Sequence, residues 1–377
     1  MTRWVAFYAP MKPPDHLVPS GDRRMARLLM AALDRAGLPP ILVNRFRSWD
    51  DGTRPERPRR LARIGQWHAD RIASHLAADP PRLWFTYHLY HKAPDWLGPR
   101  VSARLNIPYV VAEASCATRQ AQGPWASGYA AARAAIVQAD RLFVLNRADI
   151  PGLRPLLNDP DRLIMLPPFL DLAADADIPI PRATGRGAMA VRFGLDPAVP
   201  WLLTVAMMRP GDKARSYAVL AAALAVLTDR PWQLLVIGDG RARPAVEAGF
   251  AAIADRVRYA GVQDAAGTRD GYHNADLFVW PAINEAYGMA ILEAQAAGLP
   301  VVAGRAGGVG DIVTDAVTGR LVAMGDAEAL AAAVAQLLDD PARRAALSVA
   351  ARHQTRTHHG LDAAAAVLRA ALAELAR

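Results

Sequence analysis

The chain has 377 residues, which at about 150 residues per domain predicts two to three domains. Hydrophobic residues make up 52% of it and charged residues 21%, so the chain can fill large cores and is not predicted to be disordered. The single cysteine, Cys116, excludes a disulfide framework and a zinc-ribbon pattern.

The net charge of +8 is partly concentrated in an Arg-rich stretch, residues 45–63. This stretch permits contact with phosphate or an anionic membrane surface, but no nucleic-acid-binding motif accompanies it, so nucleic acid is not an expected partner. The apolar run 4–11 is short and contains Pro10, which favours a first strand over a signal peptide. The longest uncharged aliphatic run, 218–227, is far below the ~18–20 residues needed to cross a bilayer. We therefore expect a cytoplasmic protein, with peripheral attachment at the inner face of the membrane left open.

Short apolar runs alternate with longer amphipathic stretches through the first half of the chain. The predicted strands cover residues 4–9, 41–46, 82–87, 108–113, 141–146 and 162–167. Strict alternation of strand and helix predicts a parallel sheet with helices on both faces.

The alternation stops at residues 168–200, which are rich in Pro, Gly, Ala and Asp, and then begins again. The second set of predicted strands covers residues 201–207, 233–238, 257–261, 276–281, 300–304 and 320–323, and residues 326–377 are predicted as helices. The pattern predicts an α/β protein with two Rossmann-like, doubly wound domains and a ligand cleft between them. We place the domains at 1–170 and 201–350, the linker at 171–200, and a C-terminal helix at 351–377 that packs back on the first domain.

The most informative segment is residues 276–313, where Glu285 and Glu293 are separated by seven residues. Glu285 closes the loop after a predicted strand, and Glu293 lies in the helix that begins near Gly288. Carboxylates bind vicinal diols well, and the free N–H groups of Met289 and Ala290 at the helix start form an anion site.

A basic pair, Arg209 and Lys213, directly follows the first strand of the second half. Two cations at the carboxyl end of a strand suit a diphosphate, with Arg binding in a bidentate manner and Lys as a point charge. The turn Ile237–Gly240 ends the next strand but is weak evidence alone.

Together these motifs resemble the donor-binding domain of the family-4 retaining glycosyltransferases, which have the GT-B fold. The matching pieces occur in the family's order: Arg209 with Lys213, VIGDG, YHNADLFVWPA, NEAYGMAILEAQAAGLPVVA, GGVGDIV and VTGRLV. The resemblance covers roughly residues 201–340, and extends more loosely to the first loop and helix and to PPFLD at 167–171.

The resemblance implies a glycosyltransferase of hexosyltransferase type that moves a sugar from a nucleotide-diphosphate donor to an acceptor, without a metal or cofactor. By position, Glu293 would hold the donor ribose and Glu285 would contact the donor sugar. Arg209 and Lys213 would neutralise the leaving diphosphate, helped by the backbone of residues 288–290. The base would lie near Gly261 and Val262, and Gly21 in the first loop would face the phosphates. The acceptor stays unidentified: glycan, lipid-linked or small molecule.

The chain departs from the family pattern at several positions. Met208 and Ala214 replace glycines that flank the basic pair, and Ala114 stands where many members carry a histidine near the reacting sugar. His88 and His91, in TYHLYHKAPDW, are predicted to line the acceptor side in its place, with Glu113 as a third candidate.

Other classes fit the sequence less well. No intact G-x-G-x-x-G follows a strand, which disfavours a dinucleotide oxidoreductase. The Asp-x-Asp pairs of a metal-dependent transferase, Asp159/Asp161 and Asp175/Asp177, fall in loops and are interpreted as turns. Two alternatives stay open: a catalytically degenerate sugar-nucleotide-binding protein, supported by the missing histidine, and a GT-B nucleotide-sugar epimerase.

Overall fold

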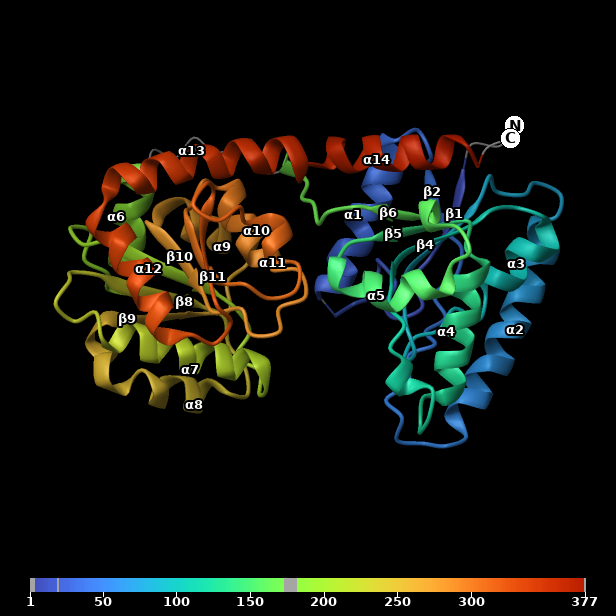
Figure 1. Ribbon diagram of the computed structural model, residues 1–377, viewed down its shortest axis with the longest axis horizontal. Helices are drawn as coiled ribbons and strands as arrows, with labels where there is room; N and C mark the ends of the chain where they lie inside the picture. The colour runs from blue at the N-terminus through green and yellow to red at the C-terminus, as the bar shows by residue number, and fades with distance from the viewer. Residues whose placement is uncertain (1–3, 19, 173–181, 376–377) are drawn as a thin grey trace. The chain divides into compact units, whose positions relative to one another are not determined.

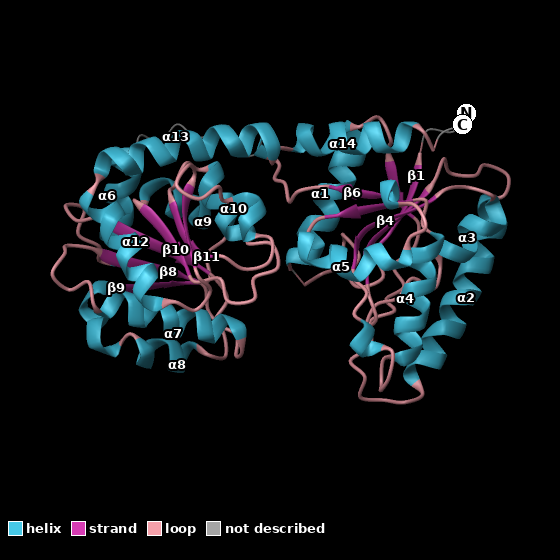
Figure 2. Ribbon diagram, viewed as in Figure 1, coloured by secondary structure: helices cyan, strands magenta, loops and turns pink. Residues whose placement is uncertain are grey.

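The computed structural model describes residues 4–18, 20–172 and 182–375. The chain divides into two compact units, unit 1 (residues 1–169 and 361–377) and unit 2 (residues 170–360). Each unit holds one six-stranded parallel sheet between helices (Figures 1 and 2). The six strands predicted in each half of the sequence are present.

Unit 1 has the strand order β2-β1-β3-β4-β5-β6. Helix α1 contacts α14, whereas α2, α3 and α4 contact one another. The elements are β1 (Val5–Tyr8), α1 (Gly21–Arg35), β2 (Pro40–Leu42), α2 (Arg57–Leu76), β3 (Trp84–Leu89), α3 (Gly98–Leu105), β4 (Tyr109–Ala114), α4 (Ala126–Gln138), β5 (Arg141–Val144), α5 (Ile150–Leu153), β6 (Leu163–Met165) and α14 (Leu361–Ala373).

Unit 2 has the strand order β12-β11-β10-β7-β8-β9. Helix α7 contacts α8 and α12, while α6 contacts α9 and α10 contacts α13. The elements are α6 (Arg182–Phe193), β7 (Trp201–Val205), α7 (Asp212–Ala225), β8 (Gln233–Ile237), α8 (Arg243–Gly249), β9 (Val257–Gly261), α9 (Ala265–Asn274), β10 (Leu277–Trp280), α10 (Met289–Ala296), β11 (Val301–Gly304), α11 (Val309–Ile312), β12 (Gly319–Val322), α12 (Ala327–Asp339) and α13 (Pro341–His358).

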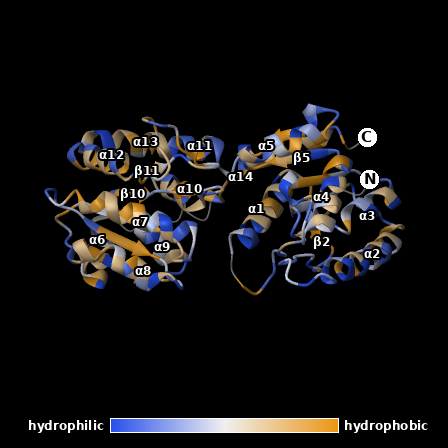
Figure 3. Cartoon of the chain, turned by 60° about the horizontal axis from the view of Figure 1, so that its bottom comes forward, coloured by the Kyte–Doolittle hydropathy of each residue, from blue (hydrophilic) through white to orange (hydrophobic). Residues whose placement is uncertain are grey.

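The central strands are buried on both faces, as expected for parallel sheets covered by helices. Figure 3 shows this as hydrophobic colour on the strands, while the helices carry both hydrophobic and hydrophilic residues. Helix α1 illustrates the pattern: Ser20 caps it by accepting the N–H of Arg23 at 3.2 Å, and residues at helical spacing such as Met25, Leu29 and Leu33 are buried.

In each sheet the order of the strands changes direction once along the chain. The site lies at this switch point. In unit 1 the chain leaves β1 toward β2 on one side and continues from β3 on the other; in unit 2 the reversal lies between β7 and β10. Parallel α/β sheets bind ligands outside the carboxyl ends of their strands at such switch points.

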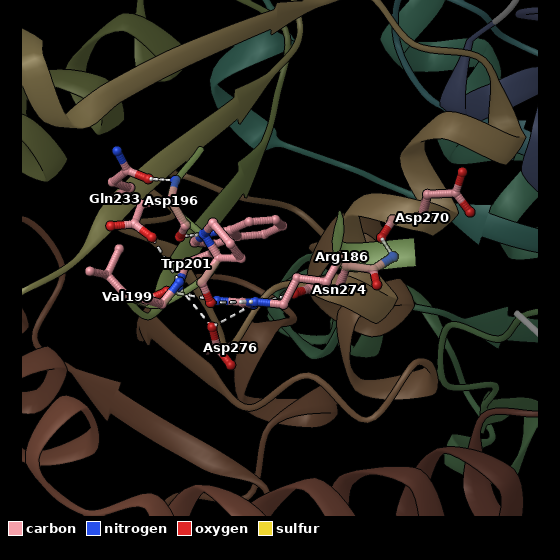
Figure 4. Close-up of polar contacts among 10 residues, drawn as sticks. Arg186, Asp196, Val199, Trp201, Gln233, Asp270, Asn274 and Asp276 are labelled. Atoms are coloured by element: carbon pink, nitrogen blue, oxygen red, sulfur yellow. Dashed lines mark hydrogen bonds and ion pairs between the residues drawn. The ribbon is translucent and has the colours of Figure 1, made fainter. Parts of the chain in front are cut away.

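The segment predicted as a linker contains helix α6, which is packed on unit 2. Its Arg186 donates to the Asp276 carboxylate at 2.9 Å and to the Val199 carbonyl at 2.6 Å, and it stacks over the Trp201 ring at 3.9 Å (Figure 4). Asp276 also accepts the N–H of Trp201 at 2.8 Å. This network lies where β7 and β10 begin, at the end of the sheet opposite the switch-point loops.

At the other end of the chain, α14 is packed against α1 in unit 1. Arg369 donates to the carbonyls of Ala36 and Arg35 at 3.2 and 2.9 Å, and Arg35 pairs with Asp362 at 2.9 Å. None of the described helices combines the length and hydropathy needed to cross a bilayer.

Candidate functional site

The switch point of unit 2 brings Lys213 and Glu285 together. Lys213 lies in the first turn of α7, and its Nζ donates to Oε2 of Glu285, which follows β10. The Trp280 indole donates to the same oxygen at 3.2 Å, and its ring lies 5.2 Å from the Lys213 ammonium. The Glu285 side chain is only 19% exposed, so this ion pair is partly desolvated. Two donors on one oxygen leave Oε1 of Glu285 available to a ligand.

The loop that carries Glu285 is held from two sides. Ser216 of α7 accepts the N–H of Ile283 at 3.0 Å, and the N–H of Gly308 donates to the Ala286 carbonyl at 2.8 Å. A Cβ at Gly307 would lie 2.1 Å from the Glu285 carbonyl, so only glycine permits this approach. Asn284 adopts a φ of 49°, a conformation that costs non-glycine residues energy and that clusters at functional sites.

Arg209 extends from a rigid support at the carboxyl end of β7. The preceding residue, Met208, is fully buried, and its N–H and carbonyl bond to Asp239 and Ala242 at 2.9 Å each. The Arg209 side chain is exposed and has no side-chain partner in the described part of the chain. The departure from glycine at 208 is thus accommodated by packing the Met208 side chain into the core.

Helix α10 begins at Gly288, which has a φ of 72° and no side-chain cap. The Gly288 carbonyl accepts the N–H groups of Ile291 and Leu292 at 2.8 and 3.0 Å. Within the described residues, no backbone acceptor pairs with the N–H groups of Met289 and Ala290, and the first turn carries no acidic side chain. The start of α10 therefore offers free donors and the positive end of the helix dipole to an anion.

Glu293, one and a half turns into α10, is half-buried and accepts a hydrogen bond from the hydroxyl of Tyr272 at 2.8 Å. Tyr272 lies on α9 and is buried. The second carboxylate of the motif is therefore fixed in direction by a side chain from the neighbouring helix.

The predicted base-binding residues lie at the end of β9. Gly261 has a φ of 66°, and its carbonyl accepts the N–H of Gly238 at 2.8 Å. Val262, the next residue, is 78% exposed. Gly238 is required at its position because a Cβ there would lie 2.0 Å from the Ala206 carbonyl.

The switch point of unit 1 brings His88 to Asp22. Nδ1 of His88, on β3, lies 3.0 Å from Oδ1 of Asp22 and 3.8 Å from Oε1 of Glu113 on β4. Burial lowers the pKa of His88, but the Glu113 and Asp22 carboxylates outweigh it, so the pKa is raised above its ordinary value. Gly21, the first residue of α1, is exposed and has open space where a side chain would stand.

His91 lies in different surroundings. It lines a small pocket with Asp50 and Trp96, and its ring meets Trp125 edge-on at 5.5 Å. Burial and the nearby Lys92 and Arg119 cations lower the pKa of His91. The Tyr90 ring lies 5.0 Å from the His88 ring and 5.2 Å from the His91 ring. The two histidines therefore share one aromatic neighbour but have different charged surroundings.

Sequence reasoning missed three supporting residues: Trp280, Tyr272 and Asp22. The first two are buried aromatic residues that look like core positions in the sequence, and only their polar atoms mark the site. Asp22 directly follows Gly21, and an acidic residue in a helix's first turn is common for structural reasons.

The described residues contain no group of three or more His, Cys, Asp or Glu side chains placed to hold a metal ion. Asp159 caps a short turn by accepting the N–H of Asp161 at 2.9 Å, as the turn interpretation predicts. Asp175 and Asp177 lie outside the described residues.

Comparison with known proteins identifies the family of this chain. Residues 199–340 match the family model "Glycosyl transferases group 1". The chain is 32% identical over 323 residues to a D-inositol 3-phosphate glycosyltransferase of Kineococcus radiotolerans, covering 78% of this chain and 69% of the relative. A protein of the same name from Thermobispora bispora is 38% identical over 232 residues, covering 58% of this chain and 52% of the relative. The chain thus spans about half to two thirds of the length of these two relatives.

Solved structures of low identity share the fold. Sucrose-phosphate synthase from Thermosynechococcus elongatus matches with a TM-score of 0.73 at 20% identity, covering 99% of each chain. HepE of Anabaena, solved in complex with UDP, matches with a TM-score of 0.74 at 15% identity, covering 99% of this chain and 100% of that one. Two Rossmann-like units of this kind define the GT-B glycosyltransferase fold, as the sequence motifs predicted.

Proposed function

Because this chain belongs to the group 1 glycosyltransferases, we propose that it transfers a sugar from a nucleotide-diphosphate donor, with retention at the anomeric carbon and without a metal ion. The observation that carries the proposal is the switch point of unit 2. There the Lys213–Glu285 pair, the exposed Arg209 and the uncapped start of α10 occupy neighbouring carboxyl-end loops of one sheet.

In this proposal the diphosphate is held without a metal ion, by cationic side chains and backbone N–H groups. Arg209 offers a guanidinium fork, and the N–H groups of Met289 and Ala290 add neutral donors. Lys213 has three N–H donors, so it can keep one bond to Glu285 and direct another to the phosphate. These groups are in place before the reaction, and so they stabilise the negative charge that develops on the leaving diphosphate.

The two carboxylates take different parts of the donor. Glu285, beside the phosphate-binding cations, contacts the sugar that is being transferred. Glu293, farther along α10 and held by Tyr272, accepts hydrogen bonds from the ribose hydroxyls. The base lies near Gly261 and Val262 at the end of β9.

The acceptor is proposed to bind in unit 1, at His88. The two relatives are named for D-inositol 3-phosphate, so cyclitols are the first acceptors to test.

Membrane attachment is a further part of the proposal. Helix α2 places Arg59, Arg63, Trp67 and Arg71 at every fourth position, which aligns them on one face. Trp67 is 54% exposed, with the Arg71 guanidinium 4.9 Å from its ring. A basic helix face with an exposed Trp suits the interface of an anionic bilayer.

Nucleotide binding is tested by thermal shift with UDP, GDP, ADP and TDP. A nucleotide at 100 times its Kd adds about 2.7 kcal/mol of stability, which one of the four should supply. Turnover of the matching nucleotide sugar is then measured with and without EDTA. Unchanged turnover supports neutralisation by Arg209 and Lys213, whereas inactivation that Mg²⁺ or Mn²⁺ reverses contradicts it. If no nucleoside diphosphate binds, the proposed function fails.

Membrane attachment is tested by co-sedimentation with vesicles of phosphatidylcholine, alone or mixed with anionic phosphatidylglycerol. The full chain should sediment only with the anionic vesicles, and the double variant Arg59→Glu/Arg63→Glu should not. The matched control is Arg356→Glu on α13, which should sediment as the parent does. Equal sedimentation of the α2 double variant would contradict this part of the proposal.

A further inference from the structure

His88 is surrounded by carboxylates from separate segments of unit 1. Asp22 comes from the first turn of α1, Glu113 from the end of β4, and Asp149 from the turn after β5. Asp22 and Glu113 lie 3.0 and 3.8 Å from the same ring atom, Nδ1 of His88. The Asp149 charge acts on the ring from a greater distance. No nucleotide-binding residue proposed above, other than Gly21, belongs to this region.

The backbone is strained at His88 and at Glu113. His88 and Glu113 have φ values of 63° and 59°, in the left-handed region that side chains larger than glycine rarely adopt. They occupy facing positions, because their neighbours Tyr87 and Ala112 are in register. Such residues cost on the order of 1–3 kcal/mol each and persist where the surroundings enforce them, often at functional sites.

A buried hydrogen-bond network links β3 and β4, the two strands that carry this strained pair. The Asp95 carboxylate accepts hydrogen bonds from Thr86 of β3 at 2.5 Å and from Tyr109 of β4 at 2.9 Å. Its other oxygen accepts the N–H groups of Leu97 and Gly98 at 2.8 Å. Strands β3 and β4 are therefore tied together by buried side chains as well as by their backbone pairing.

Glu113 carries a second unusual feature. Its side chain is only 10% exposed, and Oε2 is buried with no hydrogen-bond partner among the described residues. A buried carboxylate oxygen left unpaired costs about 1–3 kcal/mol or more. Oε2 of Glu113 therefore destabilises the fold. The evident interaction of Glu113 is the one with the His88 ring.

The two ring nitrogens of His88 have different surroundings. Both close carboxylates face Nδ1, while Nε2 is neither enclosed nor paired with a side chain in the described structure. The carboxylates raise the pKa of the ring against the effect of burial, and so favour the protonated imidazolium, in which Nε2 is a donor.

We propose that His88 donates a hydrogen bond from Nε2 to a neutral hydroxyl oxygen of a polyol acceptor, and that Asp22 and Glu113 are positioning residues that hold the ring by Nδ1. A phosphorylated group is disfavoured here because Asp22, Glu113 and Asp149 would repel it. This inference rests on the proposed function, and it assigns that function's acceptor side.

The first test is nitrogen NMR of the full chain with labelled histidine, which reports the pKa and tautomer of His88 without any turnover. Asp22→Asn and Glu113→Gln should each lower the pKa of His88, because each removes a negative charge that faces it. The other charged or titratable groups nearby, Asp149, Tyr90 and Lys12, stay in place. The control, Asp70→Asn, removes a carboxylate that pairs with Arg100 and Arg104 and should leave His88 unchanged. An unchanged His88 pKa in both positioning variants would overturn the proposal.

The second test adds ligands to the same sample. myo-Inositol should move the Nε2 resonance of His88, and myo-inositol 3-phosphate should move it less or not at all. A shift with the phosphate alone, or with neither compound, overturns the assignment of a neutral polyol.

The third test uses turnover of the nucleotide sugar selected by thermal shift, with myo-inositol as acceptor. His88→Ala should lower kcat/KM for myo-inositol by about 10–100-fold, the usual cost of losing a hydrogen bond from a charged group, while the affinity for the nucleotide is unchanged. Asp22→Asn should move the alkaline limb of the pH profile to lower pH, because the ring then loses its proton earlier. The control, His75→Ala on the exposed side of α2, should match the parent. Full activity of His88→Ala overturns the proposal, whereas failure of nucleotide binding in the parent refutes the proposed function and leaves the NMR result to decide the role of Asp22 and Glu113.

Discussion

The two switch points are built alike but with opposite polarity. In unit 1 the helix after the first strand carries the acid, Asp22, and the strand across the reversal carries the base, His88. In unit 2 the helix carries the cation, Lys213, and the acid, Glu285, follows the strand across the reversal. Each pair joins residues far apart in the chain, and each is partly desolvated.

The N-termini of helices α1 and α10 also differ in charge. Helix α1 is capped by Ser20 and has Asp22 in its first turn, so a protein carboxylate already occupies the positive end of its dipole. Helix α10 has a glycine at its N-cap and no acid in its first turn. From this comparison we propose that unit 2 receives the anionic part of the substrates and unit 1 a hydroxyl-rich, neutral part.

The largest effect is expected for Glu285→Gln. The change keeps the shape of the side chain but removes the charge that pairs with Lys213, so turnover should fall by about 10²–10³. Nucleoside diphosphate affinity should stay near the parent value, because the proposal assigns the carboxylate to the sugar and not to the phosphates. Steady-state kinetics and calorimetric titration measure the two quantities, and Glu328→Gln on the exposed start of α12 is the control. A loss of nucleotide affinity as large as the loss of turnover would contradict the assignment to the sugar.

Glu293→Gln should behave in the opposite way. The proposed contact of Glu293 with the ribose would be the same in ground and transition states, so the nucleotide affinity should fall while turnover of bound donor is nearly unchanged. The Tyr272 hydroxyl can still donate to the amide oxygen, which keeps the local structure intact. Unchanged affinity would remove Glu293 from the nucleotide site.

Arg209→Ala should weaken nucleoside diphosphate binding by about 1.5–3 kcal/mol, the range for hydrogen bonds to charged groups. Nucleoside binding should be unaffected, because the side chain is assigned to phosphate. Arg215→Ala is the matched control, since Arg215 already pairs with Asp212. Equal losses for nucleoside and nucleoside diphosphate would show that Arg209 does not contact phosphate.

A smaller effect is expected for Trp280→Phe. Phenylalanine keeps an aromatic ring near Lys213 but removes the indole N–H that donates to the Glu285 carboxylate at 3.2 Å. One long hydrogen bond to a charged group is lost, which at that length lies at the lower end of the range of about 1.5–3 kcal/mol for such bonds. Turnover should fall by severalfold at unchanged nucleotide affinity. A loss of affinity without a loss of turnover would mean that Trp280 supports the fold and does not orient Glu285.

The strands and the motif were predictable because buried parallel strands are short apolar runs, and because the two glutamates and the basic pair sit at fixed places relative to them. The partners of those residues were not predictable. Lys213 and Glu285 are 72 positions apart, and Asp22 and His88 are 66 apart, so only the strand order brings them together. Helix α6 was missed because its Pro- and Gly-rich surroundings favour a linker, whereas tertiary contacts of Arg186 hold it on unit 2.

The smallest expected effect is the pH dependence of stability from the Asp22–His88 pair. Despite burial, the hydrogen bond and charge of His88 lower the pKa of Asp22 from 3.8, so its contribution is present above that value and is lost as pH falls through the lowered pKa. The raised pKa of His88 gives a contribution that is present below 6.5 and is lost as pH rises through the raised pKa. The pair therefore stabilises unit 1 fully between pH 3.8 and 6.5, the ordinary pKa values of the two groups, and this stabilisation is lost at higher pH as His88 loses its proton. Asp22→Asn should lower the calorimetric Tm at about pH 5 by a few degrees at most, since 1 kcal/mol corresponds to about 2–4 °C at this size. The difference from the parent should shrink as pH rises through the raised pKa of His88, because the imidazole then loses its charge. A difference that stays constant across this range would mean that His88 carries no charge in the pair, and the polarity on which the comparison of the two switch points rests would be wrong for unit 1.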